Sequence, residues 1–126
     1  MSNDFLNVFL NEMKTNVNGF IAVAVTEIES GLSFGNLTVD PGFDPELAAA
    51  YNLEVVKAKL SAVKALNLNQ DIEDILITLS NQIHIIDISP NKKFMIYLAA
   101  DSTKANLGMT RAILRKHKLE LEKNLA

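Results

Sequence analysis

Apolar residues near the start of the chain recur with the spacing of a helix. Phe5, Phe9 and Met13 fall on one side, and apolar residues repeated every three to four positions are typical of an amphipathic helix with one buried stripe. This pattern predicts a helix from Asp4 to about Asn16. Asn18-Gly19 follows it and ends it.

Five segments rich in β-branched and apolar residues are too short for helices, and we interpret them as strands. They cover Phe20–Ile28, Leu32–Val39, Ile72–Leu79, Gln82–Ile88 and Lys93–Ala100. The third and fourth segments are separated by two residues, which is the length of a hairpin connection. Strands joined in this way form an antiparallel sheet.

Two further helices are predicted. Asp44-Pro45-Glu46 is a strong helix start, since an aspartate can cap the free amides and proline suits the first helical position. This helix is expected over Asp44–Leu66. A closing helix is expected from about Lys104 to Asn124, with Ser102 or Thr103 as its cap. The order is helix, two strands, helix, three strands, helix, which predicts an α+β fold with helices on both faces of a five-stranded antiparallel sheet.

The long helix has more apolar surface than one sheet can cover. On a helical wheel its polar stripe is narrow. One apolar arc carries the bulky residues Leu53, Val56, Leu60 and Val63. A second, alanine-rich arc consists of Leu47, Tyr51, Val55, Ala58, Ala62 and Ala65. Small residues let a second helix approach closely, so we predict that the same helix of a second copy covers this arc in a two-fold homodimer. The alternative is that a loop or the first helix of the same chain covers it.

The third strand offers a second contribution to a dimer. Asp71, Glu73 and Asp74 cluster at its start, ahead of the run Ile75–Leu79, and charges at a strand end commonly prevent uncontrolled edge pairing. A defined dimer could use this edge, with Ile75, Ile77 and Leu79, to continue one sheet into its partner. A solvated strand end is an equally open interpretation.

Composition narrows the class of protein. The chain of 126 residues suits one compact domain, and its lack of cysteine excludes disulfides, thiolate metal sites and a thiol nucleophile. No apolar run approaches the roughly 20 residues that span a bilayer, and no secretion signal is evident, so a cytoplasmic location without integral membrane association is expected. The net charge of −3 argues against general nucleic-acid binding.

Few residues are candidates for catalysis. His84 lies within a predicted strand and has no second ligand at metal-binding spacing, so we expect a hydrogen-bonded or half-exposed histidine. Gly31-Leu32-Ser33-Phe34-Gly35 matches the nucleophile-elbow pattern, but it lies in a hairpin rather than at a strand-to-helix turn. No phosphate-binding glycine loop is present. The sequence therefore predicts no catalytic residue, metal site or cofactor, and hence no enzyme.

The closing helix carries a basic stripe. It consists of Lys104, Arg111, Arg115 and Lys118. The stripe is either an electrostatic docking surface for an acidic partner or an anionic membrane, or a solvated face with cations toward the negative end of the helix.

Two segments resemble the roadblock family, which includes roadblock dynein light chains and bacterial MglB-type regulators of Ras-like GTPases. They are Ile75-Leu76-Ile77-Thr78-Leu79-Ser80-Asn81-Gln82-Ile83-His84-Ile85-Ile86 and Ala105-Asn106-Leu107-Gly108-Met109-Thr110-Arg111. The resemblance implies a single roadblock-type domain over 1–126, with the long helix on one face of the sheet and the terminal helices on the other. It also implies dimers built by pairing the long helices and the third strands.

The resemblance also implies a function, namely a homodimeric regulator or scaffold of a Ras-like small GTPase. The partner surface is expected on the exposed polar stripe of the paired helices, at Glu54, Lys57, Ser61 and Lys64. The resemblance implies regulation without an arginine finger, since bacterial members of the family act by positioning the GTPase's own residues. Arg111 therefore need not be catalytic, and a structural role at the start of the last helix is equally open. Gly108 is expected to let that helix approach the sheet. The alternatives are a general dimeric adaptor and a small-ligand sensor.

Overall fold

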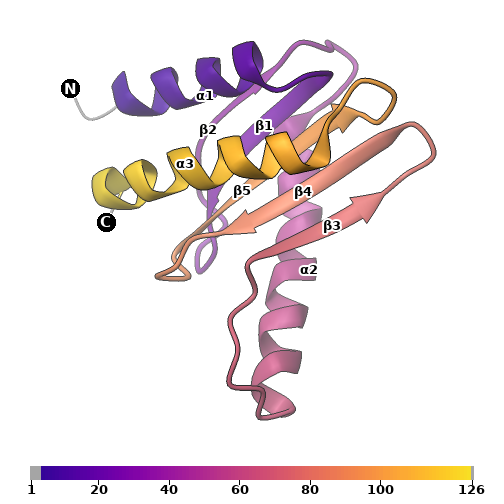
Figure 1. Cartoon of the computed structure of the whole chain (residues 1–126). Coiled ribbons are helices and arrows are strands. Elements are labelled where there is room, and N and C mark those ends of the chain that lie inside the picture. Colours follow the sequence, from indigo (N-terminus) through magenta and orange to yellow (C-terminus); the bar gives the residue numbers. More distant parts are fainter. Residues whose placement is uncertain (1–3, 126) are drawn as a thin grey trace.

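The computed structural model describes residues 4–125, and its helices and strands follow in the predicted order (Figure 1). They are α1 (Asp4–Asn16), β1 (Phe20–Glu27), β2 (Ser33–Thr38), α2 (Pro45–Ala65), β3 (Asp74–Thr78), β4 (Gln82–Ile88), β5 (Phe94–Asp101) and α3 (Leu107–Leu125). The strands form one antiparallel sheet in the order β2-β1-β5-β4-β3, so that β2 and β3 are its edges.

Helices cover both faces of the sheet, as predicted (Figure 1). On one face, Phe9 of α1 and Leu114 of α3 pack against strand residues such as Leu98. On the other face, Leu53 and Val56 of α2 pack against a second set of buried residues. Because successive strand residues point to opposite faces, β5 is buried along nearly its whole length, with a helical layer on each side.

The start of α2 follows the sequence prediction. Asp44 caps the helix by accepting hydrogen bonds from the backbone N–H groups of Glu46 and Leu47, both at 3.1 Å. Pro45 occupies the first turn, where its missing N–H leaves no bond unmade.

The start of α3 differs from the prediction. A helix from Lys104 capped by Ser102 or Thr103 is wrong, because α3 begins at Leu107. Residues 102–104 form a turn instead, in which the Asp101 carboxylate accepts a hydrogen bond from the Thr103 N–H at 2.9 Å. The side chain of Asn106 accepts from the Met109 N–H at 3.0 Å and supplies the cap.

The expected role of Gly108 is also wrong. Its backbone is exposed, and a Cβ atom built there would meet only the Asn106 side chain, at an ordinary distance of 3.6 Å. Close helix approach occurs at Gly35 of β2 instead, where a Cβ atom would lie 3.0 Å from Leu6 of α1.

Only the first half of α2 lies on the sheet. Leu53 and Val56 are buried, whereas Leu60 and Val63, expected in the same core-facing arc, are half-buried. The second half of the helix extends beyond the lower edge of the sheet (Figure 1). None of the helices within residues 4–125 combines the length and hydropathy needed to cross a membrane.

Candidate functional site

The second arc of α2 is open to solvent in the isolated chain. Leu47 is 56% exposed, Tyr51 is 73% exposed and Val55 is 37% exposed. Further along, Ala58 and Ala65 are exposed and Ala62 is half-buried. The alternative that α1 covers this arc is wrong, since α1 packs on the opposite face of the sheet (Figure 1). Large apolar side chains gathered on one exposed helix face are typical of an interaction surface.

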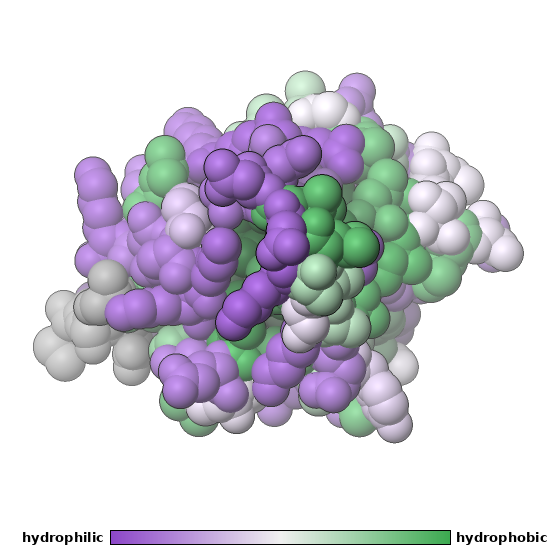
Figure 2. All heavy atoms as spheres, turned by 90° about the horizontal axis from the view of Figure 1, so that it is seen from below, coloured by the Kyte–Doolittle hydropathy of each residue, from purple (hydrophilic) through white to green (hydrophobic). Residues whose placement is uncertain are grey.

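Apolar surface continues from this arc toward the β3 edge. Ile75 and Ile77 lie on the α2 side of the sheet, where they are half-buried, and Leu79 at the end of the hairpin is 45% exposed. Figure 2 shows the molecule from below, with hydrophobic surface in the middle of the view and along its right side. The structure therefore leaves uncovered both elements that were predicted to form a dimer.

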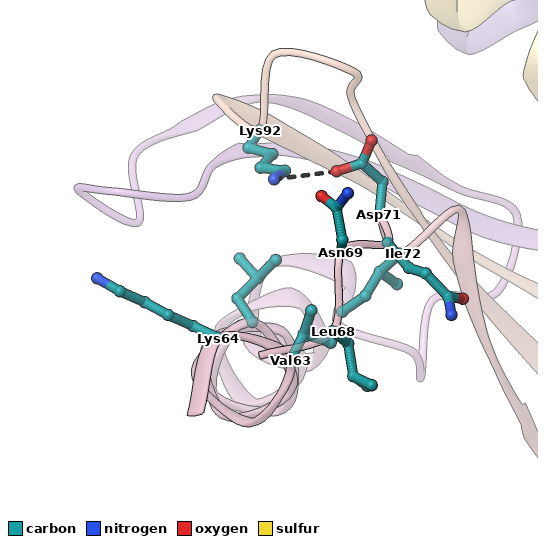
Figure 3. A pocket seen from close by; sticks show the side chains of 9 residues that line it. Val63, Lys64, Leu68, Asn69, Asp71, Ile72 and Lys92 are labelled. Atoms are coloured by element: carbon teal, nitrogen blue, oxygen red, sulfur yellow. Dashed lines mark ion pairs between the residues drawn. The ribbon is translucent and has the colours of Figure 1, made fainter. Parts of the chain in front are cut away.

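The polar stripe of α2 is exposed along its whole length. Glu54, Lys57, Ser61 and Lys64 are all exposed. Lys64 also borders a groove of about 360 Å³, which has an apolar floor that includes Val63, Leu68 and Ile72 (Figure 3). At the rim, Lys92 and Asp71 form an ion pair of 3.1 Å. Sequence reasoning missed this groove, because its walls come from α2, from the segment after it and from the β4–β5 turn.

His84 is held by hydrogen bonds on both ring nitrogens. Its Nδ1 lies 3.1 Å from the Tyr97 hydroxyl, and its Nε2 lies 2.8 Å from the Gln82 side-chain oxygen. A neutral ring satisfies both bonds, with Tyr97 donating to Nδ1 and Nε2 donating to Gln82. Burial lowers the pKa of His84 and raises the pKa of Tyr97 to about 12. This arrangement matches a hydrogen-bonded strand histidine better than a proton-transfer group.

Three of the four cations in the predicted docking stripe have acidic partners within the chain. The Arg111 guanidinium donates to both carboxylate oxygens of Asp74, from Nε and Nη2, at 2.9 Å each. Lys118 Nζ lies 2.8 Å from Asp87, and Arg115 lies 3.4 Å from Glu73. The fourth cation, Lys104, lies in the turn before α3. The first three fasten α3 to β4 and to the start of β3, which disfavours a free docking stripe.

Acidic and histidine side chains are scattered over the described part of the chain. Within residues 4–125, no three histidine or acidic side chains lie close enough together to hold a metal ion. A polar hollow of about 430 Å³ lies at the end of the sheet, beside Gly19, Gln82 and Asp101. It opens to solvent between the connecting turns.

Comparisons with solved structures identify the fold. The roadblock/LC7 domain from Streptomyces avermitilis superimposes with a TM-score of 0.81 over 94% of this chain and 95% of that one, at 11% identity. Myxococcus xanthus MglB gives a TM-score of 0.81 over 95% and 94%, at 15% identity. An MglB structure with a tetrameric arrangement gives 0.83 over 98% and 89%, at 14% identity. The chain has the roadblock fold.

The roadblock fold confirms the resemblance that the two sequence segments indicated. The sequence alone matches no family model and no curated protein. Identities of 11–15% are low, so the shared feature is the arrangement of helices and strands. Within this roadblock fold, the exposed face of α2 and the neighbouring β3 edge form the candidate functional site.

Proposed function

We propose that the chain is a homodimeric, non-enzymatic, cytoplasmic regulator or scaffold of a Ras-like small GTPase. The observation that carries this proposal is the uncovered arc of α2, where Leu47, Tyr51 and Val55 face solvent. Covering this arc with a second copy gives the dimer, and the dimer in turn brings the two polar stripes together as a docking platform. The likeness to roadblock and MglB structures supports this choice of partner class.

The dimer forms by packing α2 against its symmetry mate. Leu47, Tyr51 and Val55 supply the bulky contacts, and Ala58, Ala62 and Ala65 let the two helix backbones approach closely. The two β3 edges, with Ile75, Ile77 and Leu79, add a second contact between the copies. A two-fold axis places each of these surfaces opposite its own copy, which is the commonest arrangement in homo-oligomers.

The GTPase docks on the outer side of the paired helices. Glu54, Lys57, Ser61 and Lys64 from both copies then line one broad polar platform. A mixed polar rim beside an apolar floor is typical of protein interfaces, and the groove next to Lys64 provides such a floor. A regulator that positions the GTPase's own residues needs no catalytic side chain from this chain.

Binding and hydrolysis assays test the partner class. A small GTPase encoded next to this chain in its genome would be mixed with the purified protein, and its affinity and hydrolysis rate would be measured with GDP and GTP. The variant K57E/K64E should bind at least about tenfold more weakly, because each change reverses a charge on the platform. The matched control K116E/K123E reverses two exposed lysines on α3 and should bind normally.

The outcomes separate the candidate functions. Neither binding nor altered hydrolysis in either nucleotide state would refute the GTPase proposal. Capture of partners that include no GTPase would favour a general dimeric adaptor. Equal loss of binding in K57E/K64E and in the α3 control would show that the platform is placed on the wrong surface.

A further inference from the structure

The edge strand β3 is held weakly by apolar packing. It has five residues, and none of them is fully buried. Ile75 and Ile77 are half-buried on the α2 side. On the α3 side, strand alternation places Asp74 beside Leu76, and Leu76 is 37% exposed. Much of what keeps β3 in the sheet must therefore come from its backbone bonds to β4 and from its charges.

Two aspartates face each other across this edge. Asp74 of β3 is the direct cross-strand partner of Asp87 of β4. Like charges directly opposite each other in an antiparallel pair are destabilising. The Asp87 side chain is only 5% exposed, so water screens this repulsion poorly, and burial together with Asp74 raises the pKa of Asp87. The repulsion between these two carboxylates has to be offset by positive charge from another element.

Helix α3 supplies two cations for these two aspartates. Arg111 forms a bidentate pair with Asp74, with the two side chains 32% and 13% exposed. Lys118 pairs with Asp87, with side chains 12% and 5% exposed. Residues seven apart lie on one helix face, so α3 presents both cations to the sheet together. Charge-assisted hydrogen bonds of this geometry are stronger than hydrogen bonds between neutral groups.

We propose that Arg111 and Lys118 form an ionic clasp through which α3 holds β3 in the sheet and positions it as the edge that pairs with a second copy. Arg111 is thus a positioning residue for dimerisation, although it lies on the face of the sheet away from α2. Without these two cations, Asp74 and Asp87 would face each other uncompensated and β3 would loosen. The pairing of β3 with a second copy rests on the proposed dimer, whereas the ionic clasp within one chain does not.

Hydrogen exchange measured strand by strand tests the clasp in the full-length protein. Arg111→Met keeps the length of the side chain and removes its charge. Amide exchange in β3 should accelerate by at least about tenfold, because an uncompensated aspartate remains at the edge. Exchange in the central strand β5 should stay unchanged. The dimer dissociation constant, measured by sedimentation, should rise at least about tenfold in parallel.

Three variants separate the clasp from general damage. Arg115→Met removes a more exposed pair on the same helix, with side chains 56% and 78% exposed, and should change β3 exchange by no more than about twofold. Asp74→Asn added to Arg111→Met removes the repulsion and should restore most of the protection. Arg111→Lys keeps the charge but loses the bidentate bond, so it should fold and show an intermediate rate.

Each outcome decides a part of the proposal. Unchanged β3 exchange in both Arg111→Met and Arg111→Lys would overturn the clasp, and so would equal acceleration in β3 and β5. Faster β3 exchange with an unchanged dissociation constant would overturn the positioning role. A wild-type monomer at high micromolar concentration, with faster β3 exchange in the variant, would confirm the clasp and refute the dimer of the proposed function.

Discussion

Tyr51 provides the sharpest test of the proposed dimer. This residue is 73% exposed on the second arc of α2, so replacing it with alanine removes little packing from the isolated chain. Alanine is also the better helix former. The stability of the protomer should therefore change by less than about 0.5 kcal/mol.

The expected loss in the dimer follows from the surface that Tyr51 leaves uncovered. Full burial of a large apolar side chain contributes about 1.5–3 kcal/mol. Nearly three quarters of this side chain remains to be buried, which corresponds to roughly 1–2 kcal/mol per copy. Two-fold symmetry doubles this to roughly 2–4 kcal/mol, or a dissociation constant about 30- to 700-fold higher.

Sedimentation equilibrium would measure both dissociation constants, and circular dichroism would confirm that the variant folds. Leu119→Ala is the matched control, because Leu119 is 56% exposed but lies on α3, on the other face of the sheet. It should leave the dissociation constant unchanged. If the Tyr51→Ala variant keeps its fold and its dissociation constant stays within about threefold of the wild-type value, the prediction that the second arc of α2 forms the dimer would be refuted.

Three further predictions concern the protomer. Leu114→Ala, at a side chain only 1% exposed in the α1–α3 core, should lower the free energy of unfolding by about 2–5 kcal/mol in urea titrations; a loss below about 1 kcal/mol would contradict the core assignment. Asp44→Ala should cost about 1 kcal/mol, because the N–H groups of Glu46 and Leu47 lose their acceptor, and unaltered unfolding would mean that the cap contributes nothing. Burial lowers the pKa of His84 below its ordinary 6.5, so the unfolded chain binds more protons at this site and the wild type should lose stability as the pH falls below 6.5. His84→Gln should flatten that slope, and equal slopes in the two proteins would contradict it.

The sequence predicted the elements well where a pattern repeats along several residues. The apolar stripe of α1, the β-branched run of β1 and the apolar run of β5 extend over enough positions to identify their type. The start of α3 rests on a few local hydrogen bonds instead. Ser102, Thr103 and Asn106 are all chemically suitable caps, and the folded chain selects Asn106 because the Asp101 carboxylate holds the turn over residues 102–104.

The charges of α3 show a different limit of sequence reasoning. Arg111 and Lys118 were visible as cations, but their partners Asp74 and Asp87 lie 37 and 31 residues away in sequence. Only the packing of α3 over the β3–β4 edge brings these four residues together. A stripe that reads as a docking surface on a helical wheel is therefore largely occupied within the chain.

Periodicity in the sequence determined the element types, their order and the excess apolar surface of α2, because burial has to follow the repeat of a helix or strand. Periodicity could not determine how far α2 extends beyond the sheet. This extension leaves Leu60 and Val63 half-buried and opens the groove beside Lys64. Nor could periodicity reveal that Asp74 and Asp87 face each other. Those features depend on strand register and on where helices cross the sheet, and both are set by packing between residues that are distant in the chain.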